Sequence, residues 1–274
     1  MTLRAKKSLG QHFLRSKVAL LQIIEAAKLS ADDVVLEIGP GEGALTEGLL
    51  ATGARVVAVE TDARCILLLQ ERFASFIKTK KFILLEGDIR NDDIQKKLFT
   101  KTHLGKDSYK LVANIPYYIT GMLFRLFLET LRQPNTIVFL IQKEVAEQIV
   151  ARDGKEGILS LAIKVFGTPH YVTKVKREAF SPPPKVDSAI IAVEDIGMKK
   201  LGGLSPELYF KVVKAGLAAR RKMLLGNLRE LNIPKETLET IFHEQHIPLT
   251  ARGEDVSAEK WRELVRALAP YIKK

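Results

Sequence analysis

Between residues 34 and 194, short apolar runs alternate with segments in which apolar residues recur every three or four positions. The short runs predict buried strands, and the wider spacing predicts helices with one apolar stripe. This alternation is typical of a mostly parallel sheet covered on both faces, so we expect a Rossmann-like, doubly wound α/β fold with seven strands. The predicted strands are residues 34–38, 55–60, 82–86, 110–113, 136–141, 171–175 and 189–193, and the helices between them include 46–50, 63–76 and 123–131.

A glycine-containing stretch at residues 196–205 separates this pattern from the end of the chain. Beyond it no strand pattern appears, and residues 209–231, 235–242 and 258–268 predict three helices. Ser205 followed by Pro206 fits an N-cap with proline in the first helical turn. We therefore expect two domains, an α/β domain with a basic N-terminal arm at 1–200 and a small all-helical domain at 203–274.

The composition narrows the class of protein. Of the 274 residues, 46% are hydrophobic, yet no uninterrupted apolar run approaches the ~20 residues of a membrane span, and no signal-type apolar block stands at the N-terminus. The single cysteine, Cys65, lies in an apolar run, which predicts a core position and excludes a disulfide within the chain. We expect a cytoplasmic protein that acts as a monomer.

The charge points to a polyanionic partner. Lys and Arg outnumber Asp and Glu by 43 to 32, giving a net charge of +11 and a pI of about 9.6. No acid precedes Glu25, so the basic residues before it form a positive arm at Arg4, Lys6, Lys7, Arg15 and Lys17. Such an arm favours nucleic acid through counterion release, although a solvated basic tail is the alternative.

A glycine-rich turn follows the first predicted strand. Glu37 is followed by Gly39, Gly41 and Gly43, and glycines in such a turn let a ligand approach the backbone. Glu60 ends the next strand, where a carboxylate accepts from ribose hydroxyls. The two features predict a cofactor that contains a nucleoside, and a dinucleotide remains open because the glycine pattern alone is weak.

Two acids favour S-adenosylmethionine over a dinucleotide. Glu37 before the turn fits the E-x-G-x-G-x-G form found in methyltransferases, and Asp88 follows the third predicted strand. If Glu60 accepts from the ribose and Asp88 accepts from the adenine amine, the two acids hold an adenosyl group, and no residues that bind a pyrophosphate are needed. The alternative for Asp88 is a turn or N-cap role.

Asn114, Ile115, Pro116 and Tyr117 end the fourth predicted strand, at the sheet edge where ligands bind in such folds. An adenine N6 amine is a poor nucleophile, and acceptors that take its hydrogens draw the nitrogen toward a pyramidal geometry. Asn114 offers an amide oxygen, and Pro116 restricts Ile115 so that the Ile115 carbonyl can face the same pocket. Tyr117 offers a face for the base. An ordinary turn with a core tyrosine is the alternative.

These blocks resemble the KsgA-type small-subunit rRNA adenine dimethyltransferases, and the likeness covers nearly the whole chain. The resemblance implies a class I methyltransferase fold. It also implies that residues 7–14, which resemble the motif that closes over the cofactor, contribute contacts from Gln11, His12 and Leu14. The remaining implied cofactor contacts are Gly39, Gly41, Glu60, Asp88, Ile89 and Asn114.

Two further blocks carry the resemblance. Residues 180–189 resemble a family block that places an aromatic on the other side of the target base, so Phe180 and Tyr117 could hold a flipped adenine between them; a buried structural Phe is the alternative. Residues 218–228 resemble a basic helix in which Arg220, Arg221 and Lys222 would meet RNA phosphates, against the alternative of a solvated basic face.

The chain also departs from the family pattern. Ile115 stands where Leu is more usual and His12 where Asn is frequent, and both preserve the relevant carbonyl or polarity. Gly216 and Leu217 stand where an aromatic is usual, and we expect Gly216 to weaken the basic helix by about 1 kcal/mol.

The resemblance implies dimethylation of two neighbouring adenines in a hairpin near the 3′ end of small-subunit rRNA, within a pre-ribosomal particle. Three rival functions stay open: a methyltransferase of large-subunit rRNA, a non-catalytic RNA-binding factor on the same scaffold, and a nicotinamide dehydrogenase. No His or Cys cluster suggests a metal site, so we expect neither metal nor membrane as a partner.

Overall fold

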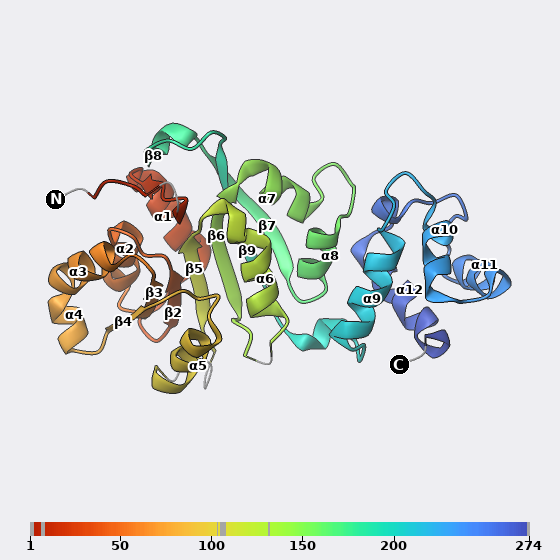
Figure 1. The fold of residues 1–274 in the computed structure, drawn as a ribbon, viewed down its shortest axis with the longest axis horizontal. Helices are drawn as coiled ribbons and strands as arrows, with labels where there is room; N and C mark the ends of the chain where they lie inside the picture. Colours follow the sequence, from red (N-terminus) through yellow and green to blue (C-terminus); the bar gives the residue numbers. More distant parts are fainter. Residues whose placement is uncertain (1–2, 7–8, 103, 105–107, 131, 273–274) are drawn as a thin grey trace. The chain divides into compact units, whose positions relative to one another are not determined.

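The computed structural model describes residues 3–6, 9–102, 104, 108–130 and 132–272 (Figure 1). Contacts divide the chain into two compact units, one of Met1–Ala146 and His170–Ile196, the other of Glu147–Pro169 and Gly197–Lys274. The second unit begins near the boundary expected from the sequence but also takes in Glu147–Pro169. The reason is local packing, since the Glu156 N–H donates to the Glu254 carbonyl at 2.7 Å and the Tyr209 hydroxyl to the Leu161 carbonyl at 3.4 Å.

The first unit is built on a seven-stranded sheet with the order β4-β3-β2-β5-β6-β9-β7. The pairs β2–β3, β2–β5, β3–β4 and β5–β6 are parallel, whereas β9 runs antiparallel to β6. Parallel strands end at the same edge, so the segments after β2, β3 and β5 meet there. The strands are β2 (Val34–Ile38), β3 (Arg55–Glu60), β4 (Phe82–Glu86), β5 (Lys110–Asn114), β6 (Thr136–Gln142), β7 (Thr168–Val175) and β9 (Ser188–Glu194).

Helices cover both faces of this sheet. Ile23, Leu49 and Leu69, on three different helices, share one buried cluster with Val56 and Val112 of the sheet. On the opposite face the ring of Phe124 contacts Phe139, with centroids 5.0 Å apart. The helices of the chain up to residue 164 are α1 (Lys17–Ala27), α2 (Ala44–Ala51), α3 (Ala63–Arg72), α4 (Ala74–Lys78), α5 (Asp92–Lys101), α6 (Thr120–Leu128), α7 (Lys143–Val150) and α8 (Ile158–Lys164).

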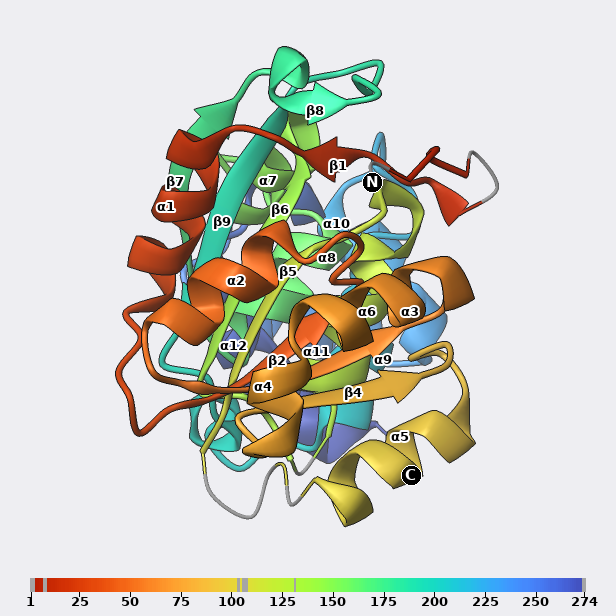
Figure 2. The same ribbon diagram turned by 90° about the vertical axis from the view of Figure 1, so that its left-hand side faces the viewer.

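Two very short strands form a separate pair that the sequence did not predict. β1 (Phe13–Leu14) runs antiparallel to β8 (Phe180–Ser181), with Leu14 opposite Phe180. Figure 2 shows this pair crossing above the sheet edge. The pairing joins the N-terminal segment to a loop more than half the chain away, so it depends on tertiary contacts rather than on local pattern.

The second unit is helical outside the first residues of β7. Its C-terminal helices are α9 (Pro206–Gly216), α10 (Leu224–Leu228), α11 (Lys235–Glu244) and α12 (Ala258–Leu268). Trp261 of α12 is fully buried, and its ring N–H donates to the Gly253 carbonyl at 3.0 Å. Short 3₁₀ helices cover Tyr117–Ile119, Arg177–Ala179, Met198–Leu201, Arg229–Leu231, Gly253–Asp255 and Ala269–Tyr271.

Two predicted helices are interrupted in the structure. The helix expected at 63–76 is broken at Phe73, whose backbone leaves the helical region (φ −111°, ψ 24°) while its ring packs edge-on against Phe82. The helix expected at 209–231 ends at Gly216, where a side chain would stand 2.4 Å from the ring of Trp261. Gly216 therefore permits close helix packing instead of weakening a longer helix.

Candidate functional site

The glycine turn lies between β2 and α2 at the carboxyl edge of the sheet. Gly39, Gly41 and Gly43 all have positive φ, at 67°, 57° and 84°. A side chain at Gly43 would meet the Phe73 ring at 2.6 Å, whereas one at Gly39 would meet nothing within 4 Å. Gly43 is thus required by packing, and Gly39 faces open space in a cavity that it helps to line.

Glu60 stands beside this turn at the end of β3. One carboxylate oxygen accepts from the Gly41 N–H at 3.0 Å, and the other accepts from the N–H groups of Thr61 (2.7 Å) and Asp62 (2.8 Å). A carboxylate offers about four acceptor positions. Three backbone N–H groups and, at 3.5 Å, the Thr61 hydroxyl approach these positions and fix the orientation of the Glu60 carboxylate in the cavity that it lines.

Glu37 is fully buried beneath the turn and lines the same cavity. Its carboxyl accepts from the Thr46 hydroxyl at 2.7 Å. Burial raises the pKa of Glu37 to about 8 and the nearby Glu60 carboxylate adds to the rise, while the Thr46 bond opposes it. Burial therefore favours the uncharged acid form of Glu37 over the carboxylate.

Asp88 and Ile89 follow β4, and neither is among the described residues that line this cavity. The Arg90 guanidinium donates to both Asp88 oxygens, at 2.5 to 3.0 Å, and lowers the pKa of that carboxyl. The Arg90 N–H also donates to Asp88 at 2.9 Å, which is the turn role left open as the alternative. Asp88 and Ile89 thus follow the strand beside Glu60, where the Gly87 N–H donates to the Glu60 carbonyl at 2.8 Å, but they lie outside the lining of this cavity.

Asn114, Ile115, Pro116 and Tyr117 all line the cavity, beside the glycine turn. The Asn114 amide N–H donates to the His12 carbonyl at 3.2 Å, which fixes the plane of the side chain. Because the nitrogen is used in this way, the amide oxygen is left as the acceptor on the other side of the group. This is the orientation that an acceptor for an adenine amine requires.

Aromatic rings bound the same part of the cavity. The Tyr117 hydroxyl bonds to the Ser188 hydroxyl at 2.7 Å, and burial raises the pKa of Tyr117. The Tyr117 ring lies nearly parallel to that of His12, with centroids 6.3 Å apart and planes 19° apart. Phe180 is buried and lines the cavity, where the β1–β8 pairing holds it.

The N-terminal segment 9–15 lines the cavity as expected for Gln11, His12 and Leu14. The Gln11 amide is engaged at both ends, by the Lys6 N–H at 2.8 Å and by the Asp62 carboxylate at 3.0 Å. Lys6, expected to meet RNA, instead pairs with Asp62 at 3.2 Å. Lys7 lies outside the described residues.

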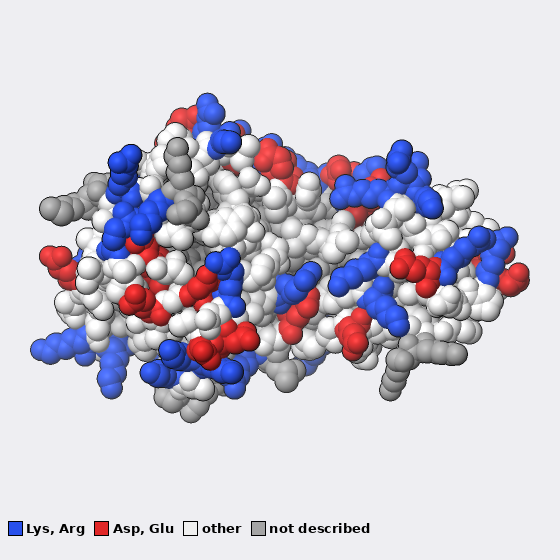
Figure 3. Space-filling view, in the orientation of Figure 1, with Lys and Arg blue, Asp and Glu red and all other residues white. Residues whose placement is uncertain are grey.

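The basic residues of the second unit lie in a loop. Arg220, Arg221 and Lys222 are exposed between α9 and α10, so the family's basic helix is not helical here. The buried Asn227 side chain closes this loop by donating to the Gly216 and Ala219 carbonyls at 2.8 and 3.1 Å. Figure 3 shows Lys and Arg side chains gathered around this part of the second unit.

Several residues of the site carry no motif signal strong enough to be found in the sequence. Asp62 and Glu42 anchor the N-terminal segment, Ser188 holds Tyr117, and Thr46 holds Glu37. Three of them lie near patterns that the sequence does show, since Glu42 stands within the glycine turn, Ser188 within residues 180–189, and Asp62 two residues after Glu60 at a strand end. Among the described residues, no three His, Cys, Asp or Glu side chains are grouped to hold a metal ion, and no helix is long and apolar enough to cross a bilayer.

Comparison with known proteins decides the family. A family model described as ribosomal RNA adenine dimethylase matches residues 2–269. The chain belongs to this family. It is 42% identical over 265 residues to the ribosomal RNA small subunit methyltransferase A of Dehalococcoides mccartyi (strain CBDB1), covering 96% of this chain and 88% of that protein. The Synechocystis protein of the same name is 38% identical, with 99% of each chain covered.

Solved structures agree with the fold. A dimethyladenosine transferase from Plasmodium falciparum superimposes with a TM-score of 0.77 at 24% identity, covering 94% of this chain and 98% of that one. The 23S rRNA methyltransferase ErmE gives 0.74 at 26% identity, covering 94% and 99%. The predicted class I methyltransferase fold and the predicted family are confirmed. This member of the dimethylase family is an enzyme, a methyltransferase, which sets aside the dehydrogenase and the non-catalytic factor.

Proposed function

We propose that this chain transfers methyl groups from S-adenosylmethionine to the N6 amines of two adjacent adenines in a hairpin near the 3′ end of small-subunit rRNA. The relatives named for the small ribosomal subunit, aligned over nearly the whole chain, support the choice of RNA. We place the reaction in the cytoplasm, on a pre-ribosomal particle, with the enzyme acting as a monomer.

The observation that carries this proposal is the position of Asn114. Its amide nitrogen is committed to the His12 carbonyl, and its oxygen remains as an acceptor in the cavity that the glycine turn lines. An acceptor next to a nucleoside site is what methylation of an exocyclic amine needs, since it orients the amine and stabilises positive charge on nitrogen.

The methyltransferase family to which the chain belongs supports S-adenosylmethionine as the cofactor. The Glu60 carboxylate is held by backbone N–H groups where it can accept from a ribose hydroxyl, a role that suits any cofactor containing a nucleoside. Gly39 leaves open space where the ligand would approach the backbone. The residues proposed to hold the cofactor are Gln11, His12, Leu14, Gly39, Gly41, Glu60, Asp88, Ile89 and Asn114.

When bound, S-adenosylmethionine supplies an electrophilic methyl group on a sulfonium. The Asn114 oxygen and the Ile115 carbonyl accept the amine hydrogens and hold the nitrogen lone pair toward the methyl group, with Pro116 fixing the turn. Tyr117 and Phe180 hold the flipped base, and stacking on one aromatic contributes ~1 to 3 kcal/mol. No side chain is needed as a general base, because the methylated amine is acidic enough to release its proton to water.

Arg220, Arg221 and Lys222 are proposed to contact RNA phosphates. All three are exposed in a loop that Asn227 holds in place. Contacts of this kind position the RNA without reading its sequence. Lys6 and Lys7 complete the proposed RNA-binding set, with Lys6 already paired to Asp62.

The deciding experiment is mass spectrometry of RNA after incubation with the protein and methyl-labelled S-adenosylmethionine. Small-subunit particles, free small-subunit rRNA and large-subunit rRNA, each lacking the modification, are compared. We expect N6,N6-dimethyladenosine at two adjacent positions in the small-subunit samples only. Label in large-subunit rRNA alone would replace the proposal with the function named for ErmE, and label in no sample would overturn it.

A further inference from the structure

Asp62 accepts hydrogen bonds from a residue at the start of α3 and from residues near the N-terminus. It is the N-cap of α3, and its carboxylate is fully buried although it carries a charge. It accepts from Arg64 at 2.6 and 3.1 Å, from the Gln11 amide at 3.0 Å and from the Lys6 ammonium at 3.2 Å. Two of these partners, Gln11 of the N-terminal segment and Lys6 just before it, are more than 50 residues away in the sequence.

The link from Asp62 continues into the segment. The Gln11 oxygen accepts from the Lys6 N–H at 2.8 Å, and the Gln11 N–H reaches the Lys6 carbonyl at 3.4 Å. The Gln11 side chain is therefore held at both ends, by the Lys6 backbone N–H and by the Asp62 carboxylate. Since the Gln11 side chain is used in this way, its backbone position depends on the Asp62 carboxylate.

The next residue along the chain touches the reaction centre. The His12 carbonyl accepts from the Asn114 amide, and the His12 ring nitrogen Nδ1 bonds to the Pro182 carbonyl at 2.8 Å. An unbroken chain of contacts thus runs from Asp62 through Gln11 and His12 to Asn114. Figure 1 shows the N-terminal segment passing between the start of α3 and β8.

We propose that Asp62 is a positioning residue for Asn114, acting through Gln11 and the His12 carbonyl. This inference rests on the proposed function of Asn114 and adds to it what sets the orientation of the amide. Asp62 does not line the cavity. Its charge holds the segment in place, and the segment holds the amide nitrogen so that the oxygen stays available.

If Asp62 served only to cap α3, replacing it with Asn would leave the N-terminal segment and Asn114 unchanged. As an N-cap it accepts from the Arg64 N–H at 3.2 Å, and Asn serves as an N-cap about as well as Asp. Asp62→Asn therefore keeps the cap of α3 and removes the charge that binds Lys6 and Arg64. The substitution separates helix capping from the hold on the N-terminal segment.

The first measurement needs neither cofactor nor RNA. In ¹⁵N spectra of the full-length protein, the Asn114 side-chain amide, assigned by its loss in Asn114→Asp, reports the bond to the His12 carbonyl. We expect slowed hydrogen exchange of that amide in the native protein and at least about tenfold faster exchange in Asp62→Asn and in Gln11→Ala. Unchanged exchange in both variants would overturn the proposal.

The second measurement is a double-mutant cycle in methyl transfer at saturating cofactor and RNA. We expect kcat to fall about tenfold or more in Asp62→Asn and in Gln11→Ala, and the double variant to be no slower than the slower single variant, because both changes break one path. Effects that multiply would contradict the shared path. The matched control is Asp93→Asn, an exposed acid on α5, for which we expect kcat and exchange to be unchanged.

The two proposals fail in different ways. If the native protein makes no dimethyladenosine in any rRNA, the proposed function is wrong, while the exchange of the Asn114 amide still tests the link from Asp62. If the native protein is active and Asp62→Asn matches it in both readouts, the function stands and the positioning role is wrong.

Discussion

The glycine turn and Glu60, which form the core of the proposed cofactor side of the cavity, come from one local stretch of the sheet edge, whereas the proposed target side is assembled from three distant segments. On the cofactor side the glycine turn and Glu60 follow adjacent parallel strands, and backbone N–H groups fix the carboxylate. On the target side Asn114, the N-terminal segment that contains β1, and β8 meet only through tertiary contacts. The cofactor side is therefore preorganised by the sheet, while the target side depends on how the N-terminal segment is held.

The largest effect is expected from Asn114→Ala, which removes the acceptor and keeps the sheet edge intact. Loss of a preorganised group of this kind costs ~10²- to 10³-fold in kcat, so methyl transfer should become almost undetectable. Cofactor affinity, measured by calorimetry, should change by less than about tenfold because Glu60 and the glycine turn are untouched. Full turnover in this variant would contradict the proposed role of Asn114, and with it the division of the cavity into a cofactor side and a target side.

Asn114→Asp sharpens the same test. It keeps an oxygen of the same size and loses the N–H that donates to the His12 carbonyl. A carboxylate facing that carbonyl is repelled, so we expect the Asp variant to be nearly as impaired as the Ala variant. Near-native activity would mean that the bond to His12 does not orient the side chain.

Tyr117 is expected to show the next largest effect. Tyr117→Ala removes one stacking face, worth ~1 to 3 kcal/mol, so kcat/KM for RNA should fall by about 5- to 150-fold. Tyr117→Phe keeps the ring and loses only the bond to Ser188, so its kcat/KM should stay within about fivefold of the native value. Equal losses in the two variants would mean that the hydroxyl, and not the ring, carries the role.

The contrast between the two sides of the cavity also explains which strands and site residues could be predicted from the sequence. Strands β2, β3 and β4 were predicted with their observed bounds, because apolar β-branched runs bounded by turns carry a strong local signal. The glycine turn and Glu60 were likewise found from their spacing. Both belong to the side of the cavity that one local stretch builds.

What the sequence missed depends on contacts between distant residues. The two-residue strands β1 and β8 have no pattern of their own, and the anchor at Asp62 joins residues 51 and 56 positions apart. The basic segment was predicted as a helix because its residues favour one, but Gly216 packs against Trp261 and Asn227 ties the following loop to the end of α9. Tertiary packing overrides local propensity at these places.

Charge reversal in the basic loop is expected to weaken RNA binding without changing any residue that lines the cavity. With Arg220, Arg221 and Lys222 changed to Glu, affinity for small-subunit rRNA should fall about tenfold or more and the slope of log K against log salt should decrease by about 1 for each lost phosphate contact. Cofactor affinity should not change. An unchanged salt slope would remove the loop from the RNA-binding surface.

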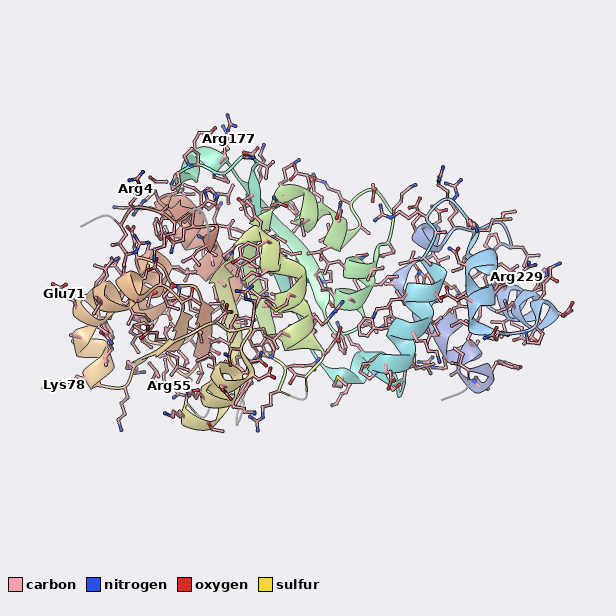
Figure 4. The ribbon with its side chains drawn as sticks, in the orientation of Figure 1. Arg4, Arg55, Glu71, Lys78, Arg177 and Arg229 are labelled. Atoms are coloured by element: carbon pink, nitrogen blue, oxygen red, sulfur yellow. The ribbon has the colours of Figure 1, made fainter. Side chains whose placement is uncertain are left out.

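The control for this prediction reverses three other exposed cations of the second unit, Lys214, Arg229 and Lys235. Arg229, labelled in Figure 4, lies just after α10. The control changes the net charge equally, so it measures the long-range electrostatic part alone. An equal loss of affinity in the two triple variants would show that total charge, and not this loop, governs binding.

The smallest effect on turnover is expected at Glu37, where the change concerns stability and its dependence on pH. Burial raises the pKa of Glu37 to about 8 in the folded protein, above the usual value of 4.5 for a glutamate side chain. Between these values the folded state holds a proton that the unfolded chain has lost, so the free energy of unfolding decreases as pH rises from about 4.5 to about 8.

Glu37→Gln keeps an acceptor for the Thr46 hydroxyl and removes the titration. The free energy of unfolding, measured in urea, should therefore depend less on pH, by more than ~1 kcal/mol between pH 5 and 8. Glu86→Gln, an exposed acid at the end of β4, should leave the slope as it is. If Glu37→Gln also keeps the native slope, Glu37 is ionised in the fold and the cofactor side carries two negative charges, which would predict a stronger preference for a cationic ligand than Glu60 alone provides.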